Sequence, residues 1–189
     1  MSIIDSILNV FLGDKGKKDV KEVTPIVNSI LKIEEDLKNI SNDDLRSITN
    51  SFKKEIQELK NPFYDKIEKI KETISQSENI DENEKRYNEI EKVENNYLDS
   101  LDKYLDSILP KAFAVIKETT KRFNNNIEII VKSTPFDEKI SSNKTYVKLN
   151  GDNAIWSNSW DAAGKKIVWD MVHYDVQLIG GIALHQGKI

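Results

Sequence analysis

The apolar residues near the N-terminus recur at helical intervals. Over residues 1–12 they form one strongly apolar face, and polar residues occupy the opposite face. Gly13 and Gly16 follow and are predicted to end the helix, and four lysines up to Lys21 supply local positive charge. The pattern predicts an amphipathic helix and a basic linker over residues 1–21. Its apolar face either packs on the rest of the domain or lies on an anionic membrane surface.

A second apolar stripe runs through residues 22–60 and predicts N-terminal helices there. Ser41 is a residue type favoured at the N-cap, so a new helix is expected to begin beside it. Asp43 and Asp44 then fall in the first turn, where the helix dipole favours carboxylates.

Residues 61–107 are rich in Lys, Glu, Asp and Asn, and their sparser apolar residues keep a three-and-four spacing. This pattern predicts a charged pair of helices folded back on each other, with the turn at "SQSENIDENE". A charge run of this kind is usually a solvated face, and partner binding is the alternative.

The character of the chain changes twice after this pair. "ILPKAFAVIKETTKRF" predicts a compact helix over residues 108–123, with Pro110 in its first turn. Residues 124–169 are rich in β-forming residues and predict two to four short strands, with "NGDN" as a hairpin turn. The tryptophans of this stretch are candidate core residues, with ligand binding as the alternative: Trp156, Trp160 and Trp169.

Residues 170–189 predict a final helix, capped by Asp175. Gly180 and Gly181 lie inside it, and each glycine costs a helix about 1 kcal/mol relative to alanine. We therefore expect another part of the protein to approach this backbone closely, or the helix to bend there.

Composition excludes several classes of protein. No stretch approaches the roughly 18 consecutive apolar residues of a membrane-spanning helix, and the N-terminus lacks the features of a signal peptide. The absence of cysteine excludes disulfides and thiolate metal sites. A net charge of −4 gives no reason to expect nucleic acid as a partner.

Catalytic and metal-binding residues are not indicated either. His173 and His185 lie without a cysteine or a paired carboxylate at metal-ligand spacing, so no metal site is predicted. Carboxylates are so common on the charged faces that no acid–base pair can be chosen among them.

Four segments, read in order, resemble the opening of the SecA family, the motor ATPases of bacterial preprotein translocation. They are "FLGDKGKKDV", "ILKIEEDLKNISNDDLRSITNSFKKEI", "LDSILPKAFAVIKETTKRF" and "MVHYDVQLIGGIALHQGKI". The acidic helical pair around residues 62–100 and the strand-rich stretch 124–169 fall outside these segments. They look like insertions and are expected to be peripheral.

The resemblance implies an α+β fragment that includes the opening helix of a P-loop, RecA-like motor domain, with residues 108–123 as a helix of that domain and residues 170–189 as its glutamine-motif helix. It implies an ATP-driven motor that moves preproteins across the membrane through the translocation channel. Such a motor would work in the cytoplasm and peripherally on the cytoplasmic face of the inner membrane, on its anionic surface, with a homodimer among its expected states. Because the family's P-loop follows shortly after "LHQGKI", the chain is expected to be an N-terminal fragment that hydrolyses no ATP by itself. Mg²⁺ would bind through motifs absent from it.

The same resemblance points to one nucleotide contact. "YDVQ" is similar to the glutamine motif of helicase-like motors, whose carboxamide offers an acceptor and two donors. Adenine presents the complement, since its N6 amino group donates and its N7 accepts. Gln177 is therefore the expected adenine contact, and Met171 and Tyr174 are expected to flank the ring.

Two other functions compete with this reading. One is a stand-alone helical interaction protein that binds a partner without nucleotide. The other is a helicase-like nucleic-acid motor, because such motors share the glutamine motif. The acidic charge and the "LPKAFAVIKE" string favour the protein motor over the nucleic-acid motor.

Overall fold

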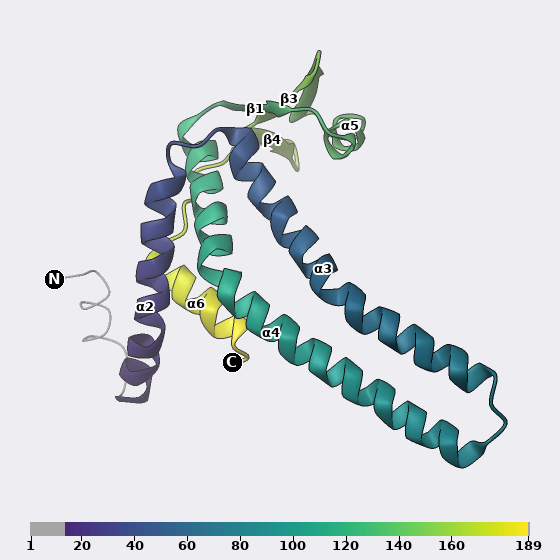
Figure 1. Ribbon diagram of the computed structural model, residues 1–189. Coiled ribbons are helices and arrows are strands. Elements are labelled where there is room, and N and C mark those ends of the chain that lie inside the picture. Colours follow the sequence, from purple (N-terminus) through teal and green to yellow (C-terminus); the bar gives the residue numbers. More distant parts are fainter. Residues whose placement is uncertain (1–13, 189) are drawn as a thin grey trace. The chain divides into compact units, whose positions relative to one another are not determined.

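A computed structural model of the chain describes residues 14–188, so the amphipathic helix predicted over residues 1–12 lies outside the described part. The chain divides into two compact units, Met1–Arg46 with Pro110–Ile189, and Ser47–Leu109. Both boundaries fall inside the two longest helices, α3 (Asn42–Ser75) and α4 (Ile80–Asn125) (Figure 1).

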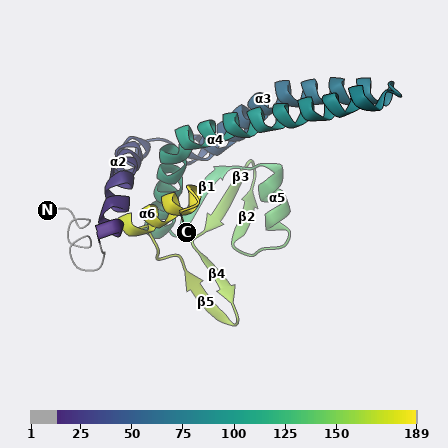
Figure 2. The same ribbon diagram turned by 90° about the horizontal axis from the view of Figure 1, so that it is seen from below.

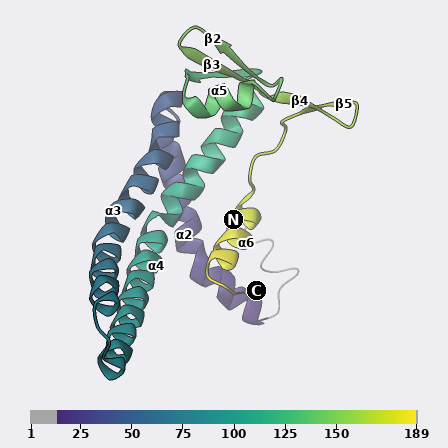
Figure 3. The ribbon, with the colours of Figure 1, turned by 90° about the vertical axis from the view of Figure 1, so that its right-hand side faces the viewer.

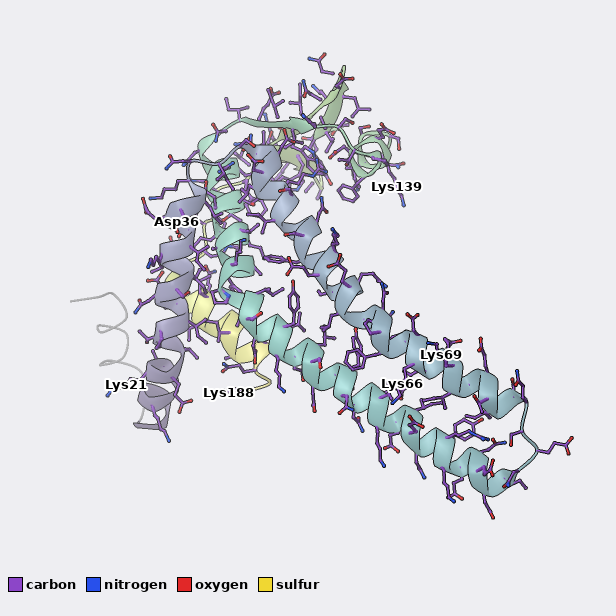
Figure 4. All side chains as sticks on the ribbon, viewed as in Figure 1. Lys21, Asp36, Lys66, Lys69, Lys139 and Lys188 are labelled. Carbon is purple, nitrogen blue, oxygen red and sulfur yellow. The ribbon has the colours of Figure 1, made fainter. Side chains whose placement is uncertain are left out.

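The unit Ser47–Leu109 is an antiparallel pair of helices, in which α3 and α4 run side by side in every view (Figures 1 and 3). Its small core contains both buried and partly buried apolar residues: Phe63, Ile67, Ile70, Ile74, Ile90 and Val93. Charged groups cover the outside of the pair, where Figure 4 labels Lys66 and Lys69. Lys66 pairs with Glu89 across the two helices at 3.0 Å. The charged helical pair and its turn are therefore confirmed.

The predicted helix boundaries are partly wrong. Pro62 lies inside α3 and Pro110 lies inside α4, well beyond the first turn that the sequence predicted for Pro110. A proline removes one backbone hydrogen bond from a helix interior, but a long helix with packed residues on both sides can continue past it. Gly16 likewise lies within α2 (Asp14–Leu37), so it does not end a helix.

The start of α3 agrees with the sequence. The Asp44 backbone N–H donates to Ser41 Oγ at 3.0 Å, so Ser41 caps the helix as predicted. Asp43 and Asp44 lie in its first turn.

The other unit packs α2 and the C-terminal part of α4 with α6 (Asp175–His185), and α6 lies against α2 (Figures 1 and 2). All three helices contribute fully buried or nearly buried apolar residues: Val23, Val27, Ile30, Ala114, Val115, Leu178 and Ile182.

Residues 127–169 form a strand-rich module within the same unit (Figure 2). A three-stranded antiparallel sheet has the order β1 (Glu128–Lys132), β3 (Asn153–Ser157), β2 (Val147–Asn150). Strands β4 (Ser159–Ala162) and β5 (Lys165–Val168) form a separate hairpin, and the short helix α5 (Pro135–Ser141) contacts β2. The described module thus has five strands rather than two to four, together with a helix that the sequence analysis did not predict.

The predicted turn at "NGDN" is confirmed. Asn150 pairs with Asn153, and Gly151 between them has φ of 57°, a conformation that favours glycine. The core beside this hairpin is small. Trp156 packs on buried Ile129, Val131 and Ala154. Trp160 and Trp169 are half-buried, and their ring centroids lie 6.3 Å apart.

No helix within residues 14–188 is long and apolar enough to cross a membrane. The same residues contain no group of three or more His, Cys, Asp or Glu side chains placed to hold a metal ion.

Candidate adenine-binding site

Two of the predicted adenine contacts, Met171 and Tyr174, lie on the segment that joins the strand-rich module to α6, and the third, Gln177, lies in α6. Residues 169–174 have no regular secondary structure and lead from β5 into the helix (Figure 3). Trp169 Nε1 donates to the Met171 carbonyl at 2.7 Å, and Lys117 Nζ donates to the His173 carbonyl at 2.5 Å. Side chains therefore hold two carbonyls of this segment, in place of a strand or helix partner.

Gln177 stands in the first turn of α6 and stabilises the start of the helix. Its Oε1 accepts the Tyr174 backbone N–H at 2.9 Å, and Tyr174 has the extended backbone of an N-cap residue. Asp175 is therefore the first residue of the helix. The prediction that Asp175 caps the helix is wrong, because Tyr174 occupies the N-cap position. A carboxylate there still benefits from the helix dipole.

The hydrogen bond to Tyr174 leaves the Gln177 amide with the groups that adenine needs. A carbonyl oxygen has two lone pairs, so Oε1 can accept a second donor while the amide nitrogen keeps both of its N–H groups. The Gln177 side chain is exposed. Its amide edge can accordingly pair with a donor and an acceptor that lie side by side.

Met171 and Tyr174 are also open to solvent, 43% and 74% exposed. The hydrogen bond from Tyr174 to Gln177 joins two of the three predicted residues, whereas the Met171 carbonyl is held by Trp169. The chemistry that these three residues offer is an exposed amide edge, one aromatic ring and one thioether.

The adjacent glycines of α6 have different surroundings. A Cβ on Gly181 would lie 2.6 Å from Cε1 of Phe113, whereas a Cβ on Gly180 would meet nothing within 4 Å. The expectation that another part of the protein approaches this backbone is therefore confirmed at Gly181. The close contact docks α6 on α4 and fixes the helix that carries Gln177.

We expect Gly180→Ala and Gly181→Ala to act in opposite directions. Both gain the helix propensity of alanine, about 1 kcal/mol. Only Gly181→Ala must displace the Phe113 ring, and overpacking of this kind costs about 1–3 kcal/mol. The free energies of unfolding of the two variants, measured by urea titration with circular dichroism, should therefore differ by about that amount. Equal stabilities would mean that Phe113 moves aside freely.

Buried charges support the helices behind this segment and were not predicted from the sequence. Lys121 of α4 pairs with Glu34 of α2, a residue that is 3% exposed. Arg122 pairs with buried Glu118 one turn earlier, at 2.8 Å. The i,i+4 spacing of this pair was the available signal, but such spacing is equally typical of exposed helix faces.

A second buried ion pair anchors the strand-rich module. Asp137 of α5 is 0% exposed and accepts two hydrogen bonds from the Arg46 guanidinium, at 2.8 and 2.9 Å. Trp156 Nε1 donates to the same carboxylate at 2.9 Å. The signal that could have found this site is the capping box that Asp137 forms with Thr134.

The first turn of α3 also covers the free edge of β1. Asn42 Nδ2 donates to the Ile130 carbonyl at 3.2 Å, and the Lys132 N–H donates to Asp43 Oδ1 at 2.8 Å. The strand-rich module is therefore hydrogen-bonded to the helical part of its own unit. A peripheral insertion would not need these hydrogen bonds.

An open groove of about 260 Å³ lies between the three-stranded sheet and the β4–β5 hairpin. Its lining is mostly polar and includes Glu128, Lys148, Asp161 and Lys166. None of the predicted adenine contacts lines this groove, so it is separate from the candidate site.

Comparison with known proteins assigns the chain to a family. A family described as "SecA DEAD-like domain" matches residues 8–189. The chain belongs to the SecA family. The protein translocase subunit SecA of Christiangramia forsetii is 50% identical over all 189 residues, and that of Flavobacterium psychrophilum is 49% identical over the same length. The protein translocase subunit SecA of Bacteroides fragilis is 39% identical over 98% of the chain.

These SecA matches cover the charged helical pair and the strand-rich module as well as the four resembling segments, because the Christiangramia forsetii and Flavobacterium psychrophilum proteins align with all 189 residues. The chain spans 17% of the length of each of the three relatives. No solved structure matches the chain.

Proposed function

We propose that this chain is the N-terminal part of an ATP-driven motor that moves preproteins across a membrane, and that the segment from Met171 to Gln177 recognises the adenine base. Membership of the SecA family supports the motor function. The observation that carries the site is the exposed Gln177 amide at the start of α6, with its oxygen partly used by Tyr174 and its N–H groups free for a ligand.

The adenine site is proposed to select the base and not to perform the chemistry. In phosphoryl-transfer motors the phosphates are held by backbone N–H groups, a lysine and Mg²⁺. The sequence contains no P-loop, so the groups that would hold the phosphates and Mg²⁺ are not assigned to residues of this chain. ATP would provide the driving force for translocation, while Gln177 would fix the orientation of its base.

The remaining assignments follow from the family and are proposals as well. The partners would be preproteins and the translocation channel at the cytoplasmic face of the inner membrane, with anionic lipids and a second copy of the chain as further contacts. The opening of a RecA-like domain at α6 belongs to the same proposal. The stand-alone interaction protein without nucleotide has no comparable support, since the family match extends over residues 8–189.

We expect Gln177→Ala to weaken ATP binding to a full-length translocase carrying this chain by roughly 1–3 kcal/mol, because adenine N6 and N7 would lose their partners. Selectivity for ATP over GTP should fall at the same time. Calorimetric titration of both nucleotides measures the two effects.

Two variants separate recognition from helix capping. Gln177→Glu keeps an oxygen for the Tyr174 N–H but removes the amide donor for N7, so it should lose selectivity while α6 stays capped. Gln186→Ala removes an exposed glutamine at the other end of the same helix and should change neither affinity nor selectivity. Wild-type ATP and GTP affinities for Gln177→Ala would remove this residue from the site.

A further inference from the structure

One buried lysine of α4 reaches the segment that precedes α6. Lys117 is 8% exposed, and its Nζ donates to the His173 carbonyl at 2.5 Å. The two residues are 56 positions apart in the sequence, with the whole strand-rich module between them. The contact therefore joins the chain just before the strand-rich module to the chain just after it.

Lys117 differs from the next two cations of α4, Lys121 and Arg122. Lys121 and Arg122 pair with Glu34 and Glu118, whereas none of the ion pairs within the described part of the chain includes Lys117. A buried charge is costly unless it is hydrogen-bonded, and a charge-assisted hydrogen bond is roughly twice as strong as a neutral one. The His173 carbonyl is thus held by a strong bond.

The hydrogen bonds that the side chains of Trp169 and Gln177 make to this segment are local. Trp169 Nε1 donates to the Met171 carbonyl, and Gln177 Oε1 accepts the Tyr174 N–H, so each joins residues two or three positions apart. At the start of the segment, the Trp169 ring contacts Phe123 of α4. At its other end, next to Tyr174, the hydrogen bond from Lys117 ties the backbone to α4.

We infer that Lys117 is a positioning residue for adenine recognition: its ammonium group holds the backbone before α6 where Tyr174 and Gln177 can face the base. This inference rests on the proposed function of Gln177 and adds a residue outside the glutamine motif. Lys117 itself does not contact the nucleotide, so its loss should change base recognition and leave phosphoryl transfer almost intact.

The test compares Lys117→Met with a matched variant, Lys121→Met, in a full-length translocase carrying this chain. Both remove one positive charge from α4, but Lys121 contacts Glu34 and not the segment. For Lys117→Met we expect KM for ATP to rise about 10-fold and the preference for ATP over GTP to fall by a similar factor, with kcat within about 2-fold. Lys117→Arg keeps a donor and should restore KM to within about 3-fold of wild type. Lys121→Met should keep the wild-type preference.

A nucleotide-free measurement tests the anchor separately from the adenine contact. Hydrogen exchange in the peptide covering residues 169–178 should be faster in Lys117→Met than in wild type, and unchanged in Lys121→Met. Wild-type exchange and a wild-type ATP preference in Lys117→Met would overturn the positioning role, as would equal losses in the two variants. If exchange is faster in Lys117→Met but Gln177→Ala leaves selectivity unchanged, Lys117 anchors the segment and Gln177 does not recognise the base.

Discussion

Replacing Asp137 with alanine should destabilise the strand-rich module by about 3–5 kcal/mol, because it leaves a partly buried guanidinium without its partner. Asp137 binds Arg46 through two parallel hydrogen bonds and also accepts the indole N–H of Trp156. Thr134, the N-cap of α5, donates to the same carboxylate through both its N–H and its hydroxyl. One substitution therefore removes the acceptor that joins α3, α5 and β3.

All three tryptophans of the chain lie in the strand-rich module, so urea unfolding followed by tryptophan fluorescence reports on this module directly. Asp161→Ala is the matched control, since Asp161 is an exposed carboxylate on β4. It should unfold within about 0.5 kcal/mol of wild type. A similar unfolding midpoint for both variants would show that the Asp137 cluster does not stabilise the module.

The same carboxylate makes this stability depend on pH. Burial by itself would raise the pKa of Asp137, but hydrogen bonds from Arg46, Thr134 and Trp156 outweigh it and hold the pKa below its ordinary value of 3.8. The folded state thus binds this proton less readily than the unfolded state. Its stabilisation is complete well above pH 3.8 and is lost as the pH falls through the lower folded-state pKa. The difference between wild type and Asp137→Ala should shrink over that acidic range.

The second large effect is expected at Arg122, where Arg122→Met should cost about 3–5 kcal/mol. Arg122 Nε binds Glu118 at 2.8 Å, and Nη1 binds Asn42 Oδ1 at 2.8 Å. Nη2 donates to the carbonyl of Leu37, the last residue of α2, at 2.9 Å and to that of Ile40, in the turn that follows, at 3.0 Å. The substitution leaves a buried carboxylate and the end of a helix without donors.

Arg86→Met provides the matched comparison. Arg86 also pairs with a glutamate four residues earlier, at 3.1 Å, but that partner, Glu82, is 54% exposed. Exposed pairs contribute about 0–1 kcal/mol, so this variant should stay close to wild type. Thermal unfolding monitored by far-ultraviolet circular dichroism compares the two. Losses of equal size would argue against the buried environment as the source of the Arg122 effect.

The sequence predicted those features whose cause is local. The Ser41 cap, the charged helical pair and the turn at Gly151 depend on spacing and on the chemistry of neighbouring residues, and all three are confirmed. The SecA resemblance came from strings such as "YDVQLIGG", and the family match confirms it. The roles of Gln177, Met171 and Tyr174 stay predictions.

Local patterns were misleading where packing outweighed propensity. Pro110 is typical of a helix start, yet it lies inside α4 because the residues on both sides belong to one continuous helix. Gly181 predicted a close approach, but the sequence could not name Phe113, which lies 68 positions earlier.

The partners of the charged residues were decided by tertiary structure alone. Arg46 and Asp137 are 91 positions apart, and Lys117 and His173 are 56 apart, so no periodicity connects them. Among 60 charged residues of similar appearance, only folding removes a few from water, and a charge removed from water must find a partner. The sequence by itself therefore determined the family, most of the helices and the candidate glutamine, and the fold selected which charges are buried and which groups they bind.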